Sequence, residues 1–147
     1  MIKIVLISHG PFCEGLLETL QMIAGPQKDV YTVALKEGES PDGYRDRLEE
    51  TISSNEKDYE GTLVLCDIKG GTPYNSAAFV SQKHQLSLVT GMNVPMAITV
   101  ITSRLPDSSL SELTKLAVDE MSVGIEQVDL NFKGGKKRGK LSINKNR

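Results

Sequence analysis

Short, almost wholly apolar segments recur along the chain, and a segment with helical spacing of apolar residues follows each of them. The apolar segments predict strands over residues 2–7, 30–35, 62–66 and 86–89, and residues 128–132 form a further candidate strand. Helices are predicted over residues 14–24, from Pro41 through Ile52, and over residues 73–82, 95–103 and 110–122. This alternation is typical of a mostly parallel sheet covered by helices on both faces. We therefore expect a doubly wound α/β fold.

The chain has the length of one domain, 147 residues, and it contains no apolar run near the roughly 20 residues that a membrane span requires. Its start lacks the long apolar region and cleavage site of a signal peptide, and it fits a first strand better. Without an export signal, Cys13 and Cys66 are expected to be reduced thiols of a cytoplasmic protein.

Charge is unevenly distributed along the sequence. Residues 133–147 carry seven basic side chains and no acidic one, although the net charge of the whole chain is −2. We expect a domain over residues 1–132 followed by a flexible, solvated basic tail. Because this tail has no aromatic residue to stack on bases, binding of nucleic acid is not expected.

Polar or glycine-rich turns follow three of the predicted strands. The first strand ends near His9, the third is followed by Asp67 and the fourth by residues 90–96. In doubly wound sheets, functional groups lie beyond the carboxyl ends of the strands, so these three turns are expected to meet at one site.

His9 and Asp67 together suggest a nucleophilic imidazole. A carboxylate that accepts a hydrogen bond from Nδ1 fixes the tautomer, leaves Nε2 free and stabilises positive charge on the ring. The alternative is a solvated histidine and a carboxylate that caps a turn. A pair formed by Cys13 and His9 is a weaker hypothesis, because Cys13 fits a small buried residue at the start of a helix.

The segment after Asp67 suits an anion. Gly70 and Gly71 would let backbone N–H groups approach phosphate closely, and Thr72 would cap the following helix and add a hydroxyl donor. The alternative is an ordinary turn. The sequence lacks both the P-loop and the dinucleotide-binding glycine pattern, and it has no Cys/His cluster with metal spacing, so neither a nucleotide, a metal nor another cofactor is predicted.

Three segments match a known family. LISHG with the following EGLL, then DIKGGTPYNSA from residue 67, and GMNVPM from residue 91, resemble the IIA domains of the mannose family of the bacterial phosphotransferase system. The resemblance covers residues 1 to about 132. It implies a four-stranded parallel sheet with a fifth, antiparallel edge strand, near residues 127–132, that is exchanged in a homodimer.

The resemblance also implies an activity. His9 would take a phosphoryl group from the phosphohistidine of the carrier HPr and pass it to a histidine of a IIB component, which phosphorylates a sugar entering through the IIC/IID membrane permease. Asp67 would orient the ring, while Gly10, Gly70, Gly71 and Thr72 would hold the phosphoryl oxygens.

Two differences from the family pattern concern the residues after His9 and the end of the domain. Pro11, Phe12 and Cys13 replace the commoner small residues, and no Ala/Pro-rich linker to a IIB domain follows, so a stand-alone subunit is expected. An apolar rim could serve transient docking of partner proteins, although core packing is the alternative for its methionines. The predicted docking residues are Phe12, Met92, Asn93 and Met96.

Other functions fit parts of the same pattern. A receiver-type regulator shares the architecture and an aspartate after the third strand, but Ser8 and His9 occupy the place of its acidic pair. A IIA-like subunit of a dihydroxyacetone kinase system resembles the second and third motifs less well. A regulator that keeps the site without catalysis is a third alternative.

Overall fold

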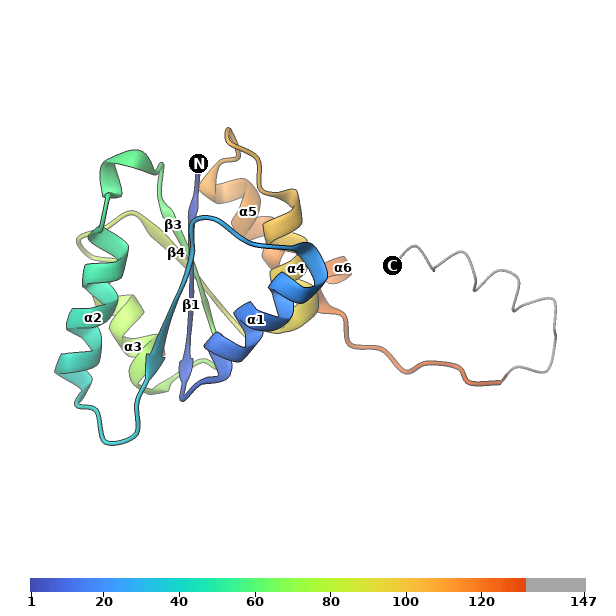
Figure 1. The fold of residues 1–147 in the computed structure, drawn as a ribbon, viewed down its shortest axis with the longest axis horizontal. Helices are drawn as coiled ribbons and strands as arrows, with labels where there is room; N and C mark the ends of the chain where they lie inside the picture. The colour runs from blue at the N-terminus through green and yellow to red at the C-terminus, as the bar shows by residue number, and fades with distance from the viewer. Residues whose placement is uncertain (132–147) are drawn as a thin grey trace.

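The computed structural model of the chain describes residues 1–131, which form one α/β domain (Figure 1). The predicted basic tail and the last residue of the candidate fifth strand lie outside the described residues. The elements in chain order are β1 Lys3–His9, α1 Phe12–Ala24, β2 Val30–Leu35, α2 Pro41–Ser53, the short 3₁₀ helix η1 Glu56–Asp58, β3 Thr62–Cys66, α3 Gly71–Val80, β4 Leu86–Thr90, α4 Val94–Ser103, α5 Leu110–Ala117 and α6 Glu120–Val123.

The four strands form one parallel sheet in the order β2-β1-β3-β4. This arrangement confirms the predicted fold class. β1 and β3 are neighbours in the sheet, with Ile7 opposite Cys66, so the residues that follow them leave the sheet at the same edge. β4 pairs with the other side of β3, which brings its end to that edge as well.

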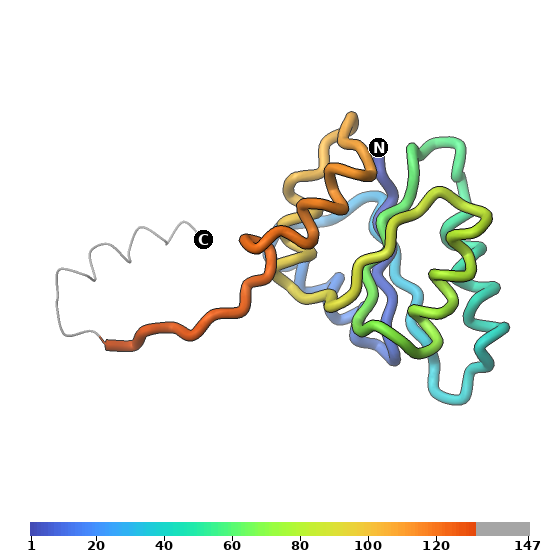
Figure 2. Tube along the Cα trace, turned by 180° about the vertical axis from the view of Figure 1, so that it is seen from behind, coloured from blue at the N-terminus to red at the C-terminus, as the bar shows by residue number. Residues whose placement is uncertain are grey.

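Helices cover both faces of the sheet, as Figures 1 and 2 show from opposite sides. α2 and α3 cover one face, where Val5, Ile7 and Val64 pack against Tyr44 and Leu48. α1, α4 and α5 cover the other face. The buried apolar residues of that second core include Ile4, Leu6, Leu16, Leu20, Leu63, Leu65, Ala97, Val100 and Leu113.

Local signals explain where several helices start. The side chain of Ser40 accepts a hydrogen bond from the Gly43 N–H, and Pro41 is the first residue of α2, as the sequence predicted. The helix predicted over residues 110–122 is wrong as one continuous element. It ends at Ala117, and Asp119 then caps the separate α6 by accepting a hydrogen bond from the Met121 N–H.

Beyond α6 the described chain leaves the body of the domain in an extended path (Figure 2). Residues 127–131 form no strand there, so the exchanged fifth strand is not seen within the described part of the chain. The segment nevertheless exposes Ile125, Val128 and Leu130. No helix among residues 1–131 is both long enough and apolar enough to cross a membrane.

Candidate functional site

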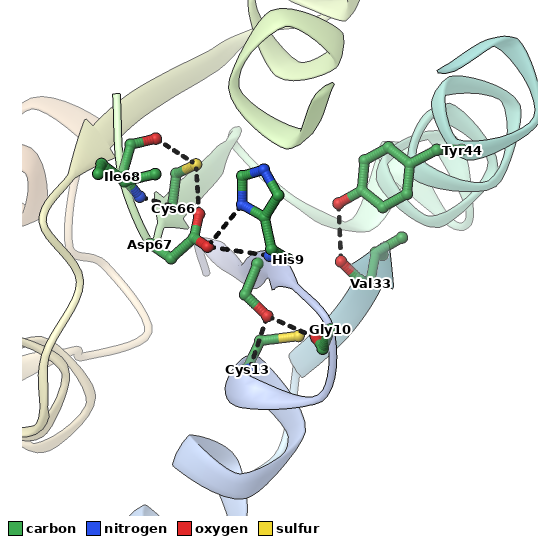
Figure 3. Close-up of polar contacts among 9 residues, drawn as sticks. His9, Gly10, Cys13, Val33, Tyr44, Cys66, Asp67 and Ile68 are labelled. Atoms are coloured by element: carbon green, nitrogen blue, oxygen red, sulfur yellow. Dashed lines mark hydrogen bonds and ion pairs between the residues drawn. The ribbon is translucent and has the colours of Figure 1, made fainter. Parts of the chain in front are cut away.

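The ends of β1 and β3 bring His9 and Asp67 into direct contact (Figure 3). The Oδ2 atom of Asp67 lies 2.9 Å from Nδ1 of His9, and it accepts a second hydrogen bond from the His9 backbone N–H at 2.9 Å. A carboxylate beside Nδ1 favours the tautomer in which this nitrogen carries the proton. In the neutral ring, Nε2 then has a free lone pair.

The carboxylate of Asp67 is also held on its other oxygen. Oδ1 accepts a hydrogen bond from the Ile68 N–H at 2.8 Å, and the Cys66 thiol lies 3.5 Å away. Burial acts to raise the pKa of Asp67, but the hydrogen bonds from His9 and Ile68 outweigh it, and the pKa is lowered. Asp67 is therefore a fixed, ionised partner for the ring.

His9 itself is accessible. Its side chain is 49% exposed, whereas the side chain of Asp67 is 17% exposed. The pair thus combines an exposed imidazole with a shielded carboxylate.

The first turn of α3 lies beside the imidazole. Gly70 and Gly71 adopt φ values of +90° and +87°, which side-chain-bearing residues rarely adopt. Gly70 is the residue before the helix, and no side chain caps the start of α3. The first backbone N–H groups of a helix have no partner within the helix. The expectation that Thr72 caps this helix is wrong, because α3 starts at Gly71 and Thr72 lies inside the first turn.

The loop after His9 is fixed by Ser8. The buried Ser8 hydroxyl accepts a hydrogen bond from the Cys13 N–H at 2.8 Å and donates one to the Gly10 carbonyl at 2.9 Å. The Gly10 N–H donates to the Leu35 carbonyl at 2.8 Å, so it is already engaged within the fold. The predicted role of Gly10 as a phosphoryl donor therefore has no support in this geometry.

The predicted docking residues differ in how deeply their side chains are buried. Met92 and Met96 are only 4% and 7% exposed and belong to the core between the sheet and α4, so core packing, the alternative for both, fits instead of docking. Sequence periodicity does not show which way Met92, in a turn, or Met96, in the first turn of α4, points. Asn93 caps α4 by accepting a hydrogen bond from the Met96 N–H, and its docking role stays a prediction.

Two exposed apolar side chains lie close to the pair in the sequence. Phe12, predicted for docking, begins α1 and is 48% exposed. Ile68, which sequence reasoning missed, directly follows Asp67 and is 59% exposed. Its position between the charged turn residues Asp67 and Lys69 was the sequence signal that could have identified Ile68.

The cysteines of the site are buried. Burial raises the pKa of the Cys13 thiol, and burial raises that of Cys66 to about 12, so both stay protonated near neutral pH. A thiolate nucleophile is therefore not favoured. Among residues 1–131 no group of three or more His, Cys, Asp and Glu side chains is arranged to hold a metal ion.

Comparison with known proteins places this chain in a family. The family model described as the PTS system fructose IIA component, where PTS is the phosphotransferase system, matches residues 3–118. The chain belongs to this IIA family. The match includes His9, Asp67 and the first turn of α3, and it confirms the resemblance seen in the sequence.

Individual relatives agree with the family assignment. The mannose-specific EIIAB component of Escherichia coli K12 is 31% identical over 126 residues, which are 85% of this chain but only 39% of that protein. The fructose-specific EIIA component of Bacillus subtilis is 30% identical over 105 residues, 71% of each protein. The chain thus spans well under half of the EIIAB protein and most of the IIA protein.

A solved structure supports the fold. The mannose/sorbose-specific IIA subunit of the phosphotransferase system from Enterococcus faecalis superposes with a TM-score of 0.77 at 32% identity. The match covers 88% of this chain and 96% of that structure. Membership of the IIA family favours neither the receiver-type alternative nor the dihydroxyacetone kinase alternative.

Proposed function

We propose that this chain is a phosphocarrier whose His9 Nε2 takes a phosphoryl group from phosphorylated HPr and hands it to a IIB component. The observation that carries the proposal is the bond between His9 Nδ1 and Asp67 Oδ2, which leaves Nε2 as the free nitrogen of an exposed ring. Membership of the IIA family supports a phosphocarrier role.

The proposed reaction moves one phosphoryl group between two imidazoles. The lone pair of His9 Nε2 forms a bond to phosphorus while the N–P bond of the donor breaks, and the electron pair of that bond returns to the donor nitrogen. Asp67 stabilises the positive charge that develops on the His9 ring. Transfer of this kind depends mainly on positioning and on charge stabilisation.

The phosphoryl oxygens would bind the first turn of α3. Backbone N–H groups at residues 70–72 and the Thr72 hydroxyl are the proposed donors, and the positive end of the ten-residue helix favours the anion. Gly70 and Gly71 keep this approach free of side chains.

Partner proteins would dock around the same edge of the sheet. Phe12 and Ile68, which lie close to His9 and Asp67 in the chain, offer exposed apolar surface that suits brief contact with HPr and then with IIB. We place the protein on the cytoplasmic side of the membrane, where a IIB component would serve the sugar permease.

We also propose a homodimer that completes the sheet. β4 is an edge strand, and the segment after α6 exposes Ile125, Val128 and Leu130. Pairing of residues 127–132 with the sheet of a second copy would bury Val128 and Leu130. Sedimentation equilibrium of the full chain tests this proposal, and a monomer at micromolar concentration contradicts it.

Phosphorylation in vitro tests the proposed function. Incubation with phosphoenolpyruvate, Enzyme I and HPr should add one acid-labile phosphoryl group to the full chain. His9→Ala should abolish the labelling, and His84→Ala, which removes the other histidine at the opposite end of the sheet, should retain it. Labelling of the His9→Ala variant contradicts the proposal.

A further inference from the structure

The imidazole of His9 lies directly against the backbone of Gly71. A Cβ atom added at Gly71 would come within 2.8 Å of Nε2 and 2.9 Å of Cε1 of His9. Non-bonded heavy atoms prefer about 3.5–4.0 Å, so even one methyl group at this position overlaps the ring. The missing side chain of Gly71 therefore provides the space that the ring occupies.

The neighbouring glycine differs in this respect. Gly70 has nearly the same φ, +90° against +87°, but a Cβ there would meet no heavy atom within 4 Å. Backbone conformation alone explains a glycine at both positions. Only Gly71 has a second, steric reason, and that reason is the His9 ring.

The bond from Nδ1 to Asp67 opposes movement of the ring away from Gly71. Its Nδ1 atom is bonded to Asp67 at 2.9 Å, and the same Asp67 oxygen is held by the His9 backbone N–H. A displaced ring would lengthen the Nδ1–Asp67 bond, which sets the tautomer and frees Nε2.

We infer that Gly71 is a positioning residue: its bare backbone seats the His9 ring so that Nδ1 reaches Asp67 while Nε2 faces the first turn of α3. This inference deepens the proposed function and rests on it, because a seated ring matters for transfer only if His9 is the carrier. The missing side chain of Gly71 acts through the position of the His9 ring, whereas the Gly71 N–H is one of the proposed donors to the phosphoryl oxygens.

Nuclear magnetic resonance of the ring nitrogens tests the position without using phosphate. In Gly71→Ala we expect the His9 ring signals to shift and the Nδ1–H tautomer to lose its dominance. Gly70→Ala is the matched control, because it introduces the same backbone strain without reaching the ring, and its His9 ring signals should stay in place. Equal ring signals in the two variants overturn the inference.

The rate of phosphoryl transfer to His9 provides the second readout. The rate of phosphorylation of Gly71→Ala by phosphorylated HPr should be about a hundredfold below that of the wild-type chain, since misplacement of a reacting group by about 1 Å can cost that much. Equal rates overturn the inference. If the wild-type chain is not phosphorylated at all, the proposed function fails, while the ring signals still test the position.

If Gly71→Ala does not fold, the wild-type protein still allows a direct test. The inference predicts a nuclear Overhauser effect between the Hε1 proton of His9 and the α protons of Gly71, because a Cβ on Gly71 would point at Cε1 of the ring. A stable, assigned protein that shows no such effect contradicts the inference.

Discussion

One oxygen of Asp67, Oδ2, accepts hydrogen bonds from both the backbone N–H and the ring Nδ1 of His9, each at 2.9 Å. The carboxylate thereby fixes the strand end and the ring with the same atom. Its position follows from the parallel pairing of β1 with β3, which places the residues after Ile7 and Cys66 side by side.

Replacing this carboxylate by an amide tests its charge. In Asp67→Asn the shape is kept, but the ionised acceptor is lost, and we expect transfer from phosphorylated HPr to slow by about 10- to 100-fold. Stopped-flow or quenched-flow labelling measures the rate, and circular dichroism checks that the variant folds. Transfer at the wild-type rate would remove Asp67 from the mechanism.

The Thr72 hydroxyl is the proposed side-chain donor to the phosphoryl group. Thr72→Val keeps the side-chain shape but removes the donor, so the rate should fall about tenfold, as expected for the loss of roughly one hydrogen bond. Thr72→Ser restores a hydroxyl and should recover most of the rate. Equal rates for the valine and serine variants contradict a donor role.

The buried Ser8 hydroxyl links β1 to α1 through Cys13 and Gly10. Ser8→Ala leaves the Cys13 N–H without its acceptor and should lower the free energy of unfolding by about 1–3 kcal/mol. Urea denaturation measures the change. Ser53→Ala, at an exposed site near the end of α2, is the control and should stay within about 0.5 kcal/mol of wild type. Equal stability of the two variants contradicts the account.

The His84 side chain should make stability depend on pH. It bridges Glu56, at 2.5 Å from Nδ1, and Glu49, at 3.0 Å from Nε2. Burial acts to lower the pKa of His84, but hydrogen bonds to Glu56 and Glu49 outweigh it, and the pKa is raised above the ordinary value of 6.5.

The sign of the effect follows from the raised pKa. Protonated His84 stabilises the fold fully below about pH 6.5, and this contribution is lost as the pH rises through the higher pKa of the folded protein. Urea denaturation should therefore show wild type losing more stability than His84→Gln as the pH rises above about 6.5. Parallel pH profiles for the two proteins contradict the prediction.

Much of the fold was predictable because the strands are apolar on both faces. The expected bounds of β2 and β3 agree with the structure, and the pairing of His9 with Asp67 followed from the rule that parallel strands end at one edge. The helix predicted over residues 110–122 failed at Asp119, whose side chain can start a helix as well as continue a polar face.

Details that depend on side-chain direction were not predictable. Met92 and Met96 follow β4, whose end was predicted to join the site, but tertiary packing turns both into the core. The contact of Gly71 with His9 has no periodic signal, because a missing side chain leaves no pattern. Such steric relationships appear only when the backbone is placed in space.

The most direct test of the account is the position of the phosphoryl group on the ring. Phosphorylated protein labelled with ¹⁵N in histidine, examined by ³¹P and ¹⁵N magnetic resonance, distinguishes a phosphoryl group on Nε2 from one on Nδ1. Because Asp67 occupies Nδ1, the account predicts phosphorylation of His9 at Nε2. A phosphoryl group on Nδ1 of His9, or on any residue other than His9, would contradict it.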